Sequence, residues 1–284
     1  MSLAGKTLFI TGASRGIGLA IALRAARDGA NVVVAAKTTE AHKHLPGTIY
    51  SAAEEIEAAG GKALPIVVDV RHEDSVHDAI DAAVARFGGI DILVNNASAI
   101  SKTGVEDTEM KRWDLMNQVN TRGTFLCSKA AIPHIRKAAN PHVLTLSPPL
   151  NLDPKWFAGH VAYTITKYSM SMAMLGMAEE YREAGIAFNC LWPRVGIATS
   201  AIEFAVGNSD EMRKCRKPEI MSDAAYAIFN KPARECTGNF FIDDTFLYDE
   251  GVRDFSTYKN DPTSKEWRVG MFLPDEDVAP EGSL

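Results

Sequence analysis

Cysteine is scarce in this sequence, and long apolar runs are missing from it. Only four cysteines occur among 284 residues, at positions 127, 190, 215 and 236, and no two of them form a Cys-x-x-Cys pair. Scattered cysteines exclude a disulfide framework and indicate free thiols in a reducing compartment. No apolar run approaches the ~18 residues that a membrane-spanning helix needs. The sequence therefore predicts a globular protein with no membrane span.

Recognisable targeting signals are also missing. The first strand-like segment begins at about Lys6, which leaves no room for a secretory signal before it. The last three residues, Gly-Ser-Leu, differ from the peroxisomal Ser-Lys-Leu signal. We therefore expect a cytoplasmic protein.

An excess of basic charge is the third missing feature. The chain has 30 basic and 36 acidic residues, a formal net charge of −6. A nucleic acid or an anionic membrane surface would favour a basic face, so neither is expected as the main partner. Hydrophobic residues make up 46% of the chain, which is enough for a large core without structural metals.

Short β-branched runs alternate with longer helical patterns along most of the chain. The predicted strands cover residues 7–11, 32–36, 63–68, 91–95, 143–147, 187–192 and 239–242. The predicted helices cover residues 15–28, 48–59, 75–87, 112–138, 161–183 and 223–230. Strands that are apolar throughout and are separated by helices predict a parallel sheet covered on both faces.

Right-handed crossovers wind such a sheet in both directions from its centre. We therefore predict an α/β fold, a doubly wound seven-stranded parallel sheet of the Rossmann type, in one domain over residues 1–248. From residue 249 the periodicity fades into an acidic tail that contains proline. We expect this tail, residues 249–284, to be partly disordered.

A glycine-rich turn follows the first predicted strand directly. Glycines let the backbone turn tightly and let a pyrophosphate approach the free N–H groups at the start of a helix. The turn begins a strand–helix–strand unit, which is the context that a dinucleotide-binding motif requires. Its candidate contacts are Gly12, Ser14, Arg15, Gly16, Ile17 and Gly18.

The end of the second strand bears on which dinucleotide is bound. An acidic residue there usually receives the ribose 2′-hydroxyl of NAD, whereas a basic residue accommodates a 2′-phosphate. The strand ends with Ala35-Ala36-Lys37, and Arg15 adds a second cation nearby. We therefore expect NADP(H). His42, Lys43 and His44 follow in a long loop, where we expect them to be solvated rather than to bind a metal.

Several motifs now resemble those of the short-chain dehydrogenase/reductase family. The matching segments, in the family's order, are Thr11–Gly18 (TGxxxGxG), Asp69 after the third strand, Asn95-Asn96-Ala97-Ser98, Val119-Asn120-Thr121-Arg122-Gly123 and Tyr163–Lys167 (YxxxK). They span roughly residues 5–245. The resemblance implies that Asp69 lies near the adenine, that Asn96 belongs to the cofactor site, and that Lys167 binds the nicotinamide ribose. It also implies that Asn120 holds a water that relays protons, and that the protein forms a dimer or a tetramer.

The chemistry of Tyr163 and Lys167 follows from their spacing. Residues at i and i+4 lie on one face of a helix. A free phenol has a pKa near 10, and a nearby ammonium favours its ionised form. Tyr163 would then donate a proton to a carbonyl oxygen, or accept one from an alcohol.

The catalytic serine is where the match to the family breaks. The family's motif ends in a double serine, and here the sequence reads Leu146-Ser147-Pro148-Pro149. Alignment from the strand puts the catalytic position at Pro148, whereas counting back from Tyr163 puts it near Leu150. Ser147 is the nearest hydroxyl and our candidate, with a local backbone hydrogen bond as the equal alternative. Asn151 is the next polar candidate.

Two further departures follow the last two strands. Pro193-Arg194 replaces the family's Pro-Gly, and Asp243-Asp244-Thr245 replaces Asp-Gly-Gly. Arg194 is expected to restrict the nicotinamide side or meet a substrate anion, unless it simply faces solvent. Trp156 and Phe157 are candidate walls of the substrate pocket. The segment 195–218, where relatives close over substrate, is apolar enough to suit an apolar substrate.

These observations predict an NADP(H)-dependent oxidoreductase that interconverts a carbonyl and a secondary alcohol. The substrate is expected to be a small molecule, apolar or lipid-like, because some relatives carry a sterol-carrier domain. The alternative is a catalytically impaired NADP(H)-binding sensor or interaction protein, which the altered serine region would favour. No metal is expected to take part.

Overall fold

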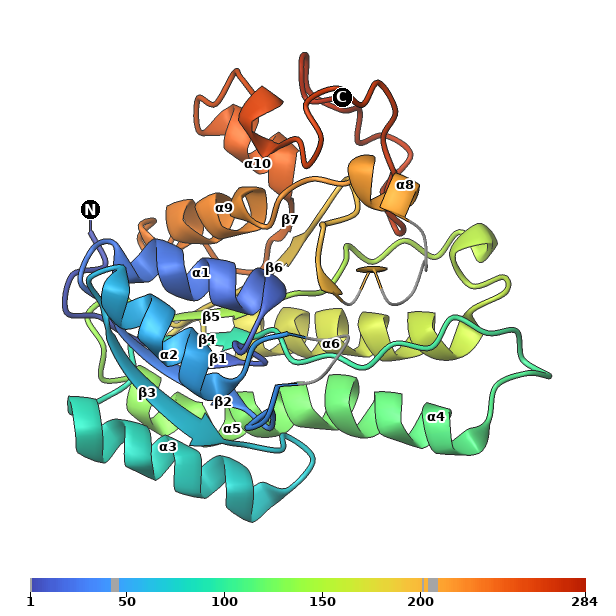
Figure 1. Ribbon diagram of the computed structural model, residues 1–284. Coiled ribbons are helices and arrows are strands. Elements are labelled where there is room, and N and C mark those ends of the chain that lie inside the picture. Colours follow the sequence, from blue (N-terminus) through green and yellow to red (C-terminus); the bar gives the residue numbers. More distant parts are fainter. Residues whose placement is uncertain (1, 42–45, 201, 204–208) are drawn as a thin grey trace.

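The computed structural model describes residues 2–41, 46–200, 202–203 and 209–284 (Figure 1). Its seven strands are all parallel and lie in the order β3-β2-β1-β4-β5-β6-β7. The strands are β1 (Thr7–Thr11), β2 (Asn31–Ala36), β3 (Lys62–Val67), β4 (Ile92–Asn95), β5 (His142–Thr145), β6 (Ala187–Trp192) and β7 (Phe240–Ile242). The predicted doubly wound seven-stranded sheet in a single domain is confirmed.

Helices connect the strands and cover both faces of the sheet (Figure 1). The α-helices are α1 (Gly16–Ala26), α2 (Ile49–Ala58), α3 (Glu73–Phe87), α4 (Met110–Met116), α5 (Gly123–Ile135), α6 (Val161–Glu180), α8 (Ser209–Arg213), α9 (Glu219–Phe229) and α10 (Asp243–Asp249). Short turns of 3₁₀-helix are η2 (Pro154–Trp156) and η3 (Ser256–Tyr258). Among the described helices, none combines the length and apolar character that a membrane crossing needs.

The core has two layers because side chains alternate along each strand. Leu8 and Ile10 of β1 pack with α1, α2 and α9 on one face. Phe9 of β1 and Val33 of β2 point to the other face, where α3, α5 and α6 cover them. Strands with apolar residues on both sides need two such layers, which is why the sequence reads as continuous apolar runs.

The single long helix predicted over residues 112–138 is interrupted. A π-helical stretch, η1 (Asn117–Arg122), lies between α4 and α5. Such insertions rearrange the helical hydrogen bonds locally and occur frequently at functional sites. This one carries Asn120, and apolar periodicity could not reveal it because the helix continues on either side.

The carboxyl ends of all seven strands meet at one edge of the sheet, where ligands bind in folds of this class. The chain first adds β2 and β3 on one side of β1, and it then crosses over to add β4 on the other side of β1. The glycine turn after β1 therefore lies at the switch point.

Arg194 and Asp244 form a buried ion pair between the ends of β6 and β7. Nε of Arg194 donates to both carboxylate oxygens of Asp244, at 2.8 and 2.9 Å. The Asp244 carboxylate also accepts from Arg216 Nη1 at 3.1 Å and from Ser283 Oγ at 2.9 Å. Asp277 completes the network by accepting from Arg194 Nη2 at 2.8 Å. Arg194 is thus buried in the protein and not solvent-facing.

This ion cluster fastens the C-terminal segment, which is red in Figure 1, beside α8 and α10. Composition suggested a partly disordered tail from residue 249. Phe255, Phe272 and Ser283 of this segment are buried, while the partial disorder expected from composition stays a prediction. Several acidic residues of the tail form ion pairs with basic residues of the domain, and composition alone does not show these pairs.

His142 opens β5 in a fully buried position, and this creates a pH dependence. Its Nε2 lies 3.1 Å from the carbonyl oxygen of Lys231, while Nδ1 has no hydrogen-bond partner. Burial lowers the pKa of His142 from 6.5 to about 4. The unfolded chain therefore binds a proton between pH 6.5 and 4 that the folded chain does not.

We predict that the free energy of unfolding falls by about 2–3 kcal/mol between pH 7 and pH 4.5 because of His142 alone, since one pKa unit corresponds to ~1.4 kcal/mol. Urea unfolding at the two pH values measures it. His142→Gln should reduce this loss by that amount, whereas His77→Gln, on the exposed side of α3, should leave it unchanged. An equal pH dependence in all three proteins would contradict the assignment.

Candidate active site

Tyr163 and Lys167 lie one turn apart on α6, both almost enclosed by protein. The exposed fraction is 6% for Tyr163 and 4% for Lys167. Nζ of Lys167 donates one hydrogen bond to the carbonyl oxygen of Leu146, at 2.9 Å. An ammonium has three donors, so two remain for a ligand. The Tyr163 hydroxyl forms no hydrogen bond with the described residues. It is not one of the unpaired polar groups that protein encloses completely, so it keeps some accessible surface.

Burial shifts the pKa of both groups toward the neutral form. It raises the pKa of the Tyr163 phenol above its usual value. It lowers the pKa of Lys167 to about 8. Burial therefore favours a protonated phenol beside a lysine that is still largely charged at neutral pH.

Asn120 is fully buried and fixes α6 against the loop after β4. Its Nδ2 donates to Thr166 Oγ1 at 3.1 Å and to the carbonyl oxygen of Ala99 at 2.9 Å. Its Oδ1 accepts from Ala99 N at 2.7 Å and from Ser98 Oγ at 3.2 Å. Both amide donors are thus used within the protein. The side chain has a positioning role here, and the relay water that the resemblance implied stays a prediction.

Asn96 performs a similar function at the glycine turn. Its Nδ2 donates to the carbonyl oxygens of Thr11 at 2.8 Å and Gly12 at 3.0 Å. Gly12 has a φ of +67°, which favours glycine. A Cβ at Gly18 would lie only 2.5 Å from Asn96 Nδ2, so this position must also be glycine. Asn96 therefore shapes the turn.

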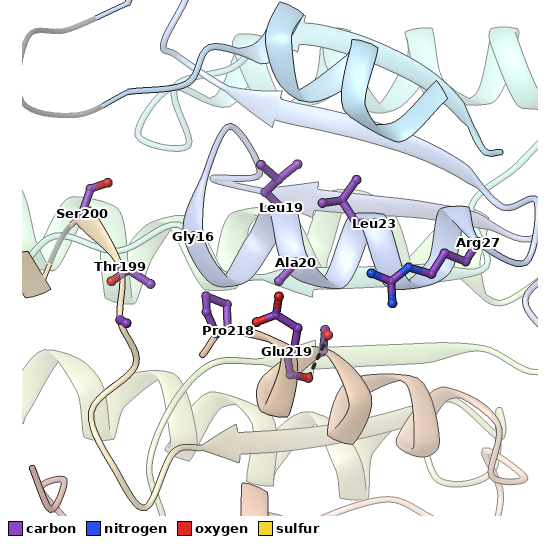
Figure 2. A pocket seen from close by; sticks show the side chains of 11 residues that line it. Gly16, Leu19, Ala20, Leu23, Arg27, Thr199, Ser200, Pro218 and Glu219 are labelled. Carbon is purple, nitrogen blue, oxygen red and sulfur yellow. Dashed lines mark hydrogen bonds between the residues drawn. The ribbon is translucent and has the colours of Figure 1, made fainter. Parts of the chain in front are cut away.

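A groove of about 280 Å³ runs along α1 from Gly16 to Arg27 (Figure 2). Thr199, from the segment after β6, lies at the Gly16 end, where its Cγ2 is 3.3 Å from a Cβ built at Gly16. The groove thus reaches the glycine turn, and Tyr163 is not among its lining residues. Sequence reasoning missed Thr199, because only the fold brings the end of β6 next to the first helix.

Lys37 and Asp69 lie at the ends of β2 and β3, next to a cation that the sequence did not single out. Arg71 donates from Nε and Nη2 to the Asp69 carboxylate, with a shortest distance of 2.6 Å. The hydrogen bonds from Arg71 lower the pKa of Asp69 to about 2, and the charge of Lys37 contributes. Lys37 is exposed and forms no ion pair with the described residues.

Arg15 points differently from what its place in the glycine turn suggested. Its Nε and Nη2 donate to the carbonyl oxygens of Pro46 at 2.9 Å and Gly47 at 2.7 Å. The guanidinium thus holds the loop before α2 against the glycine turn. The candidates His42, Lys43 and His44 lie outside the described residues. Within the described ranges, no cluster of three His, Cys, Asp or Glu residues could hold a metal ion.

Ser147 is enclosed on all sides. Its hydroxyl donates to Sγ of Cys190 in β6, at 3.2 Å. The hydroxyl is thus used within the protein, and a catalytic role for Ser147 stays a prediction. The side chain of Asn151 is also hydrogen-bonded within the protein. Its Nδ2 donates to the carbonyl oxygen of Leu273, and its Oδ1 accepts from Asp153 N.

Tyr163 belongs to an aromatic cluster that also includes the candidate wall residues Trp156 and Phe157, and its rings come from more segments than expected. Phe272 of the tail is fully buried among them. Its ring centroid lies 5.3–6.4 Å from the rings of Tyr168, Trp192, Trp156, Tyr163 and His160. Phe157 joins through an edge contact with Tyr168 at 5.5 Å.

Two nitrogen atoms in these walls are buried without a hydrogen-bond partner. They are Nε1 of Trp156 and Nε2 of His160. Buried polar groups are usually paired, so both remain able to bond a polar ligand atom. Lys102 lies near the same place, with Nζ 5.8 Å from the centre of the Tyr163 ring. The sequence gave no signal for His160 or Lys102, since neither belongs to a motif.

Comparisons with known proteins agree with this geometry. The family model described as short chain dehydrogenase matches residues 6–203. Hydroxysteroid dehydrogenase-like protein 2 from Danio rerio is 62% identical over 260 residues, and the human protein of that name is 59% identical over the same length. These matches cover 92% of this chain but 62% of either relative, so the chain spans less than two thirds of their length.

Solved structures match as well. A protein from Xanthomonas campestris is 53% identical with a TM-score of 0.93, over 97% of this chain and all of that one. A short chain dehydrogenase from Mycobacterium thermoresistibile is 50% identical with a TM-score of 0.91, over 98% and 100%. A metagenomic short-chain oxidoreductase in complex with NADP is 26% identical with a TM-score of 0.70, over 85% and 98%. The chain belongs to the short-chain dehydrogenase/reductase family of nicotinamide-dependent oxidoreductases.

Proposed function

We propose that the protein is an NADP(H)-dependent oxidoreductase that interconverts a carbonyl and a secondary alcohol. The observation that carries this proposal is the pair on α6, an unbonded tyrosine hydroxyl one turn from a buried lysine with free donors. The pair lies at the edge of the sheet where the carboxyl ends of the strands meet. A purely structural tyrosine and lysine would not need to be buried together with unused hydrogen-bonding capacity.

The glycine turn fits a dinucleotide pyrophosphate. Gly12, Gly16 and Gly18 keep Cβ atoms away from the N-terminus of α1, whose first N–H groups attract an anion. Ser14 and Ile17 belong to the same turn and would contact the phosphates. Asn96 would act on the cofactor indirectly, by holding the turn in shape.

The adenosine end favours a 2′-phosphate. Lys37 is an exposed cation where an NAD-binding protein usually has an acid. The Asp69 carboxylate, which such a site could place near the adenine, is already neutralised by Arg71. The structure in complex with NADP, at 26% identity, is consistent with this choice. Arg15 would contribute little, because its guanidinium is bound to the loop carbonyls.

The proton chemistry follows from the two pKa shifts. A phenol with a raised pKa is protonated at neutral pH, so Tyr163 is ready to donate its proton to a carbonyl oxygen. The bound cofactor supplies the hydride to the carbonyl carbon. In the reverse direction, the charge of Lys167 helps the phenol to lose its proton before it accepts one from an alcohol. Lys167 would also hold the nicotinamide ribose with its two remaining donors.

The surroundings suit an apolar or lipid-like substrate in small-molecule form. The side chains that pack around Tyr163 are largely aromatic and apolar, which is the kind of lining that an apolar ligand prefers. We also propose a homodimer or homotetramer. Phe125 of α5 and Met172 of α6 are each more than half exposed, as expected of residues at an interface between subunits.

We predict that Tyr163→Phe lowers kcat for carbonyl reduction by about 10²–10⁴-fold, the usual contribution of a positioned acid. Binding of NADPH, followed by nicotinamide fluorescence, should change less than threefold. Tyr181→Phe, at the far end of α6, is the matched control and should keep full activity. If wild type and Tyr163→Phe reduce a carbonyl equally well, the proposed mechanism is wrong.

We predict that the wild-type protein binds NADPH more tightly than NADH, and that Lys37→Glu weakens NADPH binding by roughly ten- to a hundredfold while NADH binding changes little. This is the size of a charge-assisted hydrogen bond. Parallel fluorescence titrations with the two cofactors measure it. Lys62→Glu, at the opposite end of the neighbouring strand, provides the control. Equal losses for both cofactors would remove Lys37 from the 2′-phosphate site.

A further inference from the structure

Phe272 holds an unusual backbone conformation at an unusual place. Its φ is +68°, and among the described residues it is the one residue other than glycine with positive φ. A bulky residue in the left-handed region is strained, and such strain persists only where the surroundings enforce it. The strained residue is also the fully buried centre of the aromatic cluster against Tyr163. Its ring and the Tyr163 ring are 6.2 Å apart and inclined by 36°.

The segment around Phe272 is docked by specific contacts on both sides. On the N-terminal side, Gly270 N donates to the carbonyl oxygen of Arg194 at 2.6 Å, and Trp192 Nε1 donates to that of Met271 at 2.8 Å. A Cβ at Gly270 would lie 2.8 Å from the Pro193 carbonyl oxygen, so only glycine allows this approach. The tail is thus placed against the end of β6.

On the C-terminal side, Asn151 Nδ2 donates to the carbonyl oxygen of Leu273, and Asp277 pairs with Arg194. Arg194 therefore fixes the segment twice, through its main chain at Gly270 and through its side chain at Asp277. The two departures from the family's glycines, Arg194 and Asp244, are partners of each other and form one anchor for the tail. The anchor explains how the Phe272 ring is held on Tyr163 despite the strain.

We propose that Phe272 is a specificity-determining residue, because its buried ring fills space beside Tyr163 that a bulky substrate group would need. Resting on the proposed oxidoreductase function, this assigns narrow apolar carbonyl compounds, including those with an unbranched chain, to the wild-type site and excludes a ring from the space that the phenyl group fills. Phe272 donates and accepts no proton, so its role is separate from that of Tyr163. An aromatic ring on the substrate can occupy that space only when the Phe272 ring is removed.

The test compares two ketones with the same reacting end, 2-butanone and 4-phenyl-2-butanone. Phe272→Ala should raise the ratio of kcat/KM for the phenyl ketone over that for 2-butanone by about tenfold or more, mainly through KM, since a pocket contact of this kind changes discrimination by about 10–200-fold. Asp277→Ala, which removes the carboxylate of the tail that pairs with the Arg194 side chain, should move the ratio in the same direction by a smaller factor. Phe255→Leu, another buried aromatic of the tail, and Val278→Ala, 80% exposed, are the controls and should leave the ratio within threefold of wild type.

Binding separates failure of this proposal from failure of the proposed function. If no variant reduces either ketone, the proposed function fails, and calorimetric titration with 4-phenyl-2-butanone then decides the role of Phe272. At least tenfold tighter binding by Phe272→Ala than by wild type supports it. An unchanged kcat/KM ratio in an active enzyme contradicts the proposal. Equal affinity of the two proteins, including no binding by either, also contradicts it.

Discussion

The buried pair of Arg194 and Asp244 is the interaction on which the substrate side of this molecule depends. Two charges without exposed surface are stable only if each finds its partners, because desolvation of an unpaired ion costs several kcal/mol. Here the partners include main-chain and side-chain atoms of the last residues of the chain. The energetic need to satisfy these charges is therefore also what brings the tail over the end of the sheet.

The cofactor side depends on close packing instead. Thr11, Gly12 and Gly18 surround the amide of Asn96 so tightly that a single Cβ at Gly18 would displace it. This arrangement is local, since it joins neighbouring strands β1 and β4 at their carboxyl ends. The two halves of the site are thus held by different interactions. Close packing of glycines shapes the cofactor side, and the ion pairs of the C-terminal segment hold the substrate side.

This division explains how far the sequence could lead. Apolar runs and glycine spacing are local signals, and they predicted the sheet, the order of its helices and the turn after β1. Tyr163 and Lys167 were singled out by the resemblance to the family's YxxxK motif, and the four-residue spacing explains why they share one face of α6. Phe272, His160 and Thr199 gave no signal, because their neighbours are distant in sequence and lie outside any motif. The hydrogen bond from Ser147 to Cys190, 43 residues away, gave no signal for the same reason.

Loss of the usual serine changes how the site would hold a carbonyl oxygen. With Pro148 and Leu150 at the two aligned positions, no hydroxyl of that segment faces Tyr163. The polar atoms left in the walls are Nε2 of His160 and Nε1 of Trp156, both buried without partners. Unpaired buried polar atoms are costly in a folded protein unless a ligand satisfies them. Nε1 of Trp156 donates, whereas Nε2 of His160 donates or accepts according to the tautomer, so their presence beside an intact tyrosine and lysine favours a site that still binds a polar group over one that has become inert. An aromatic surface around those atoms is what the proposed apolar substrate would need.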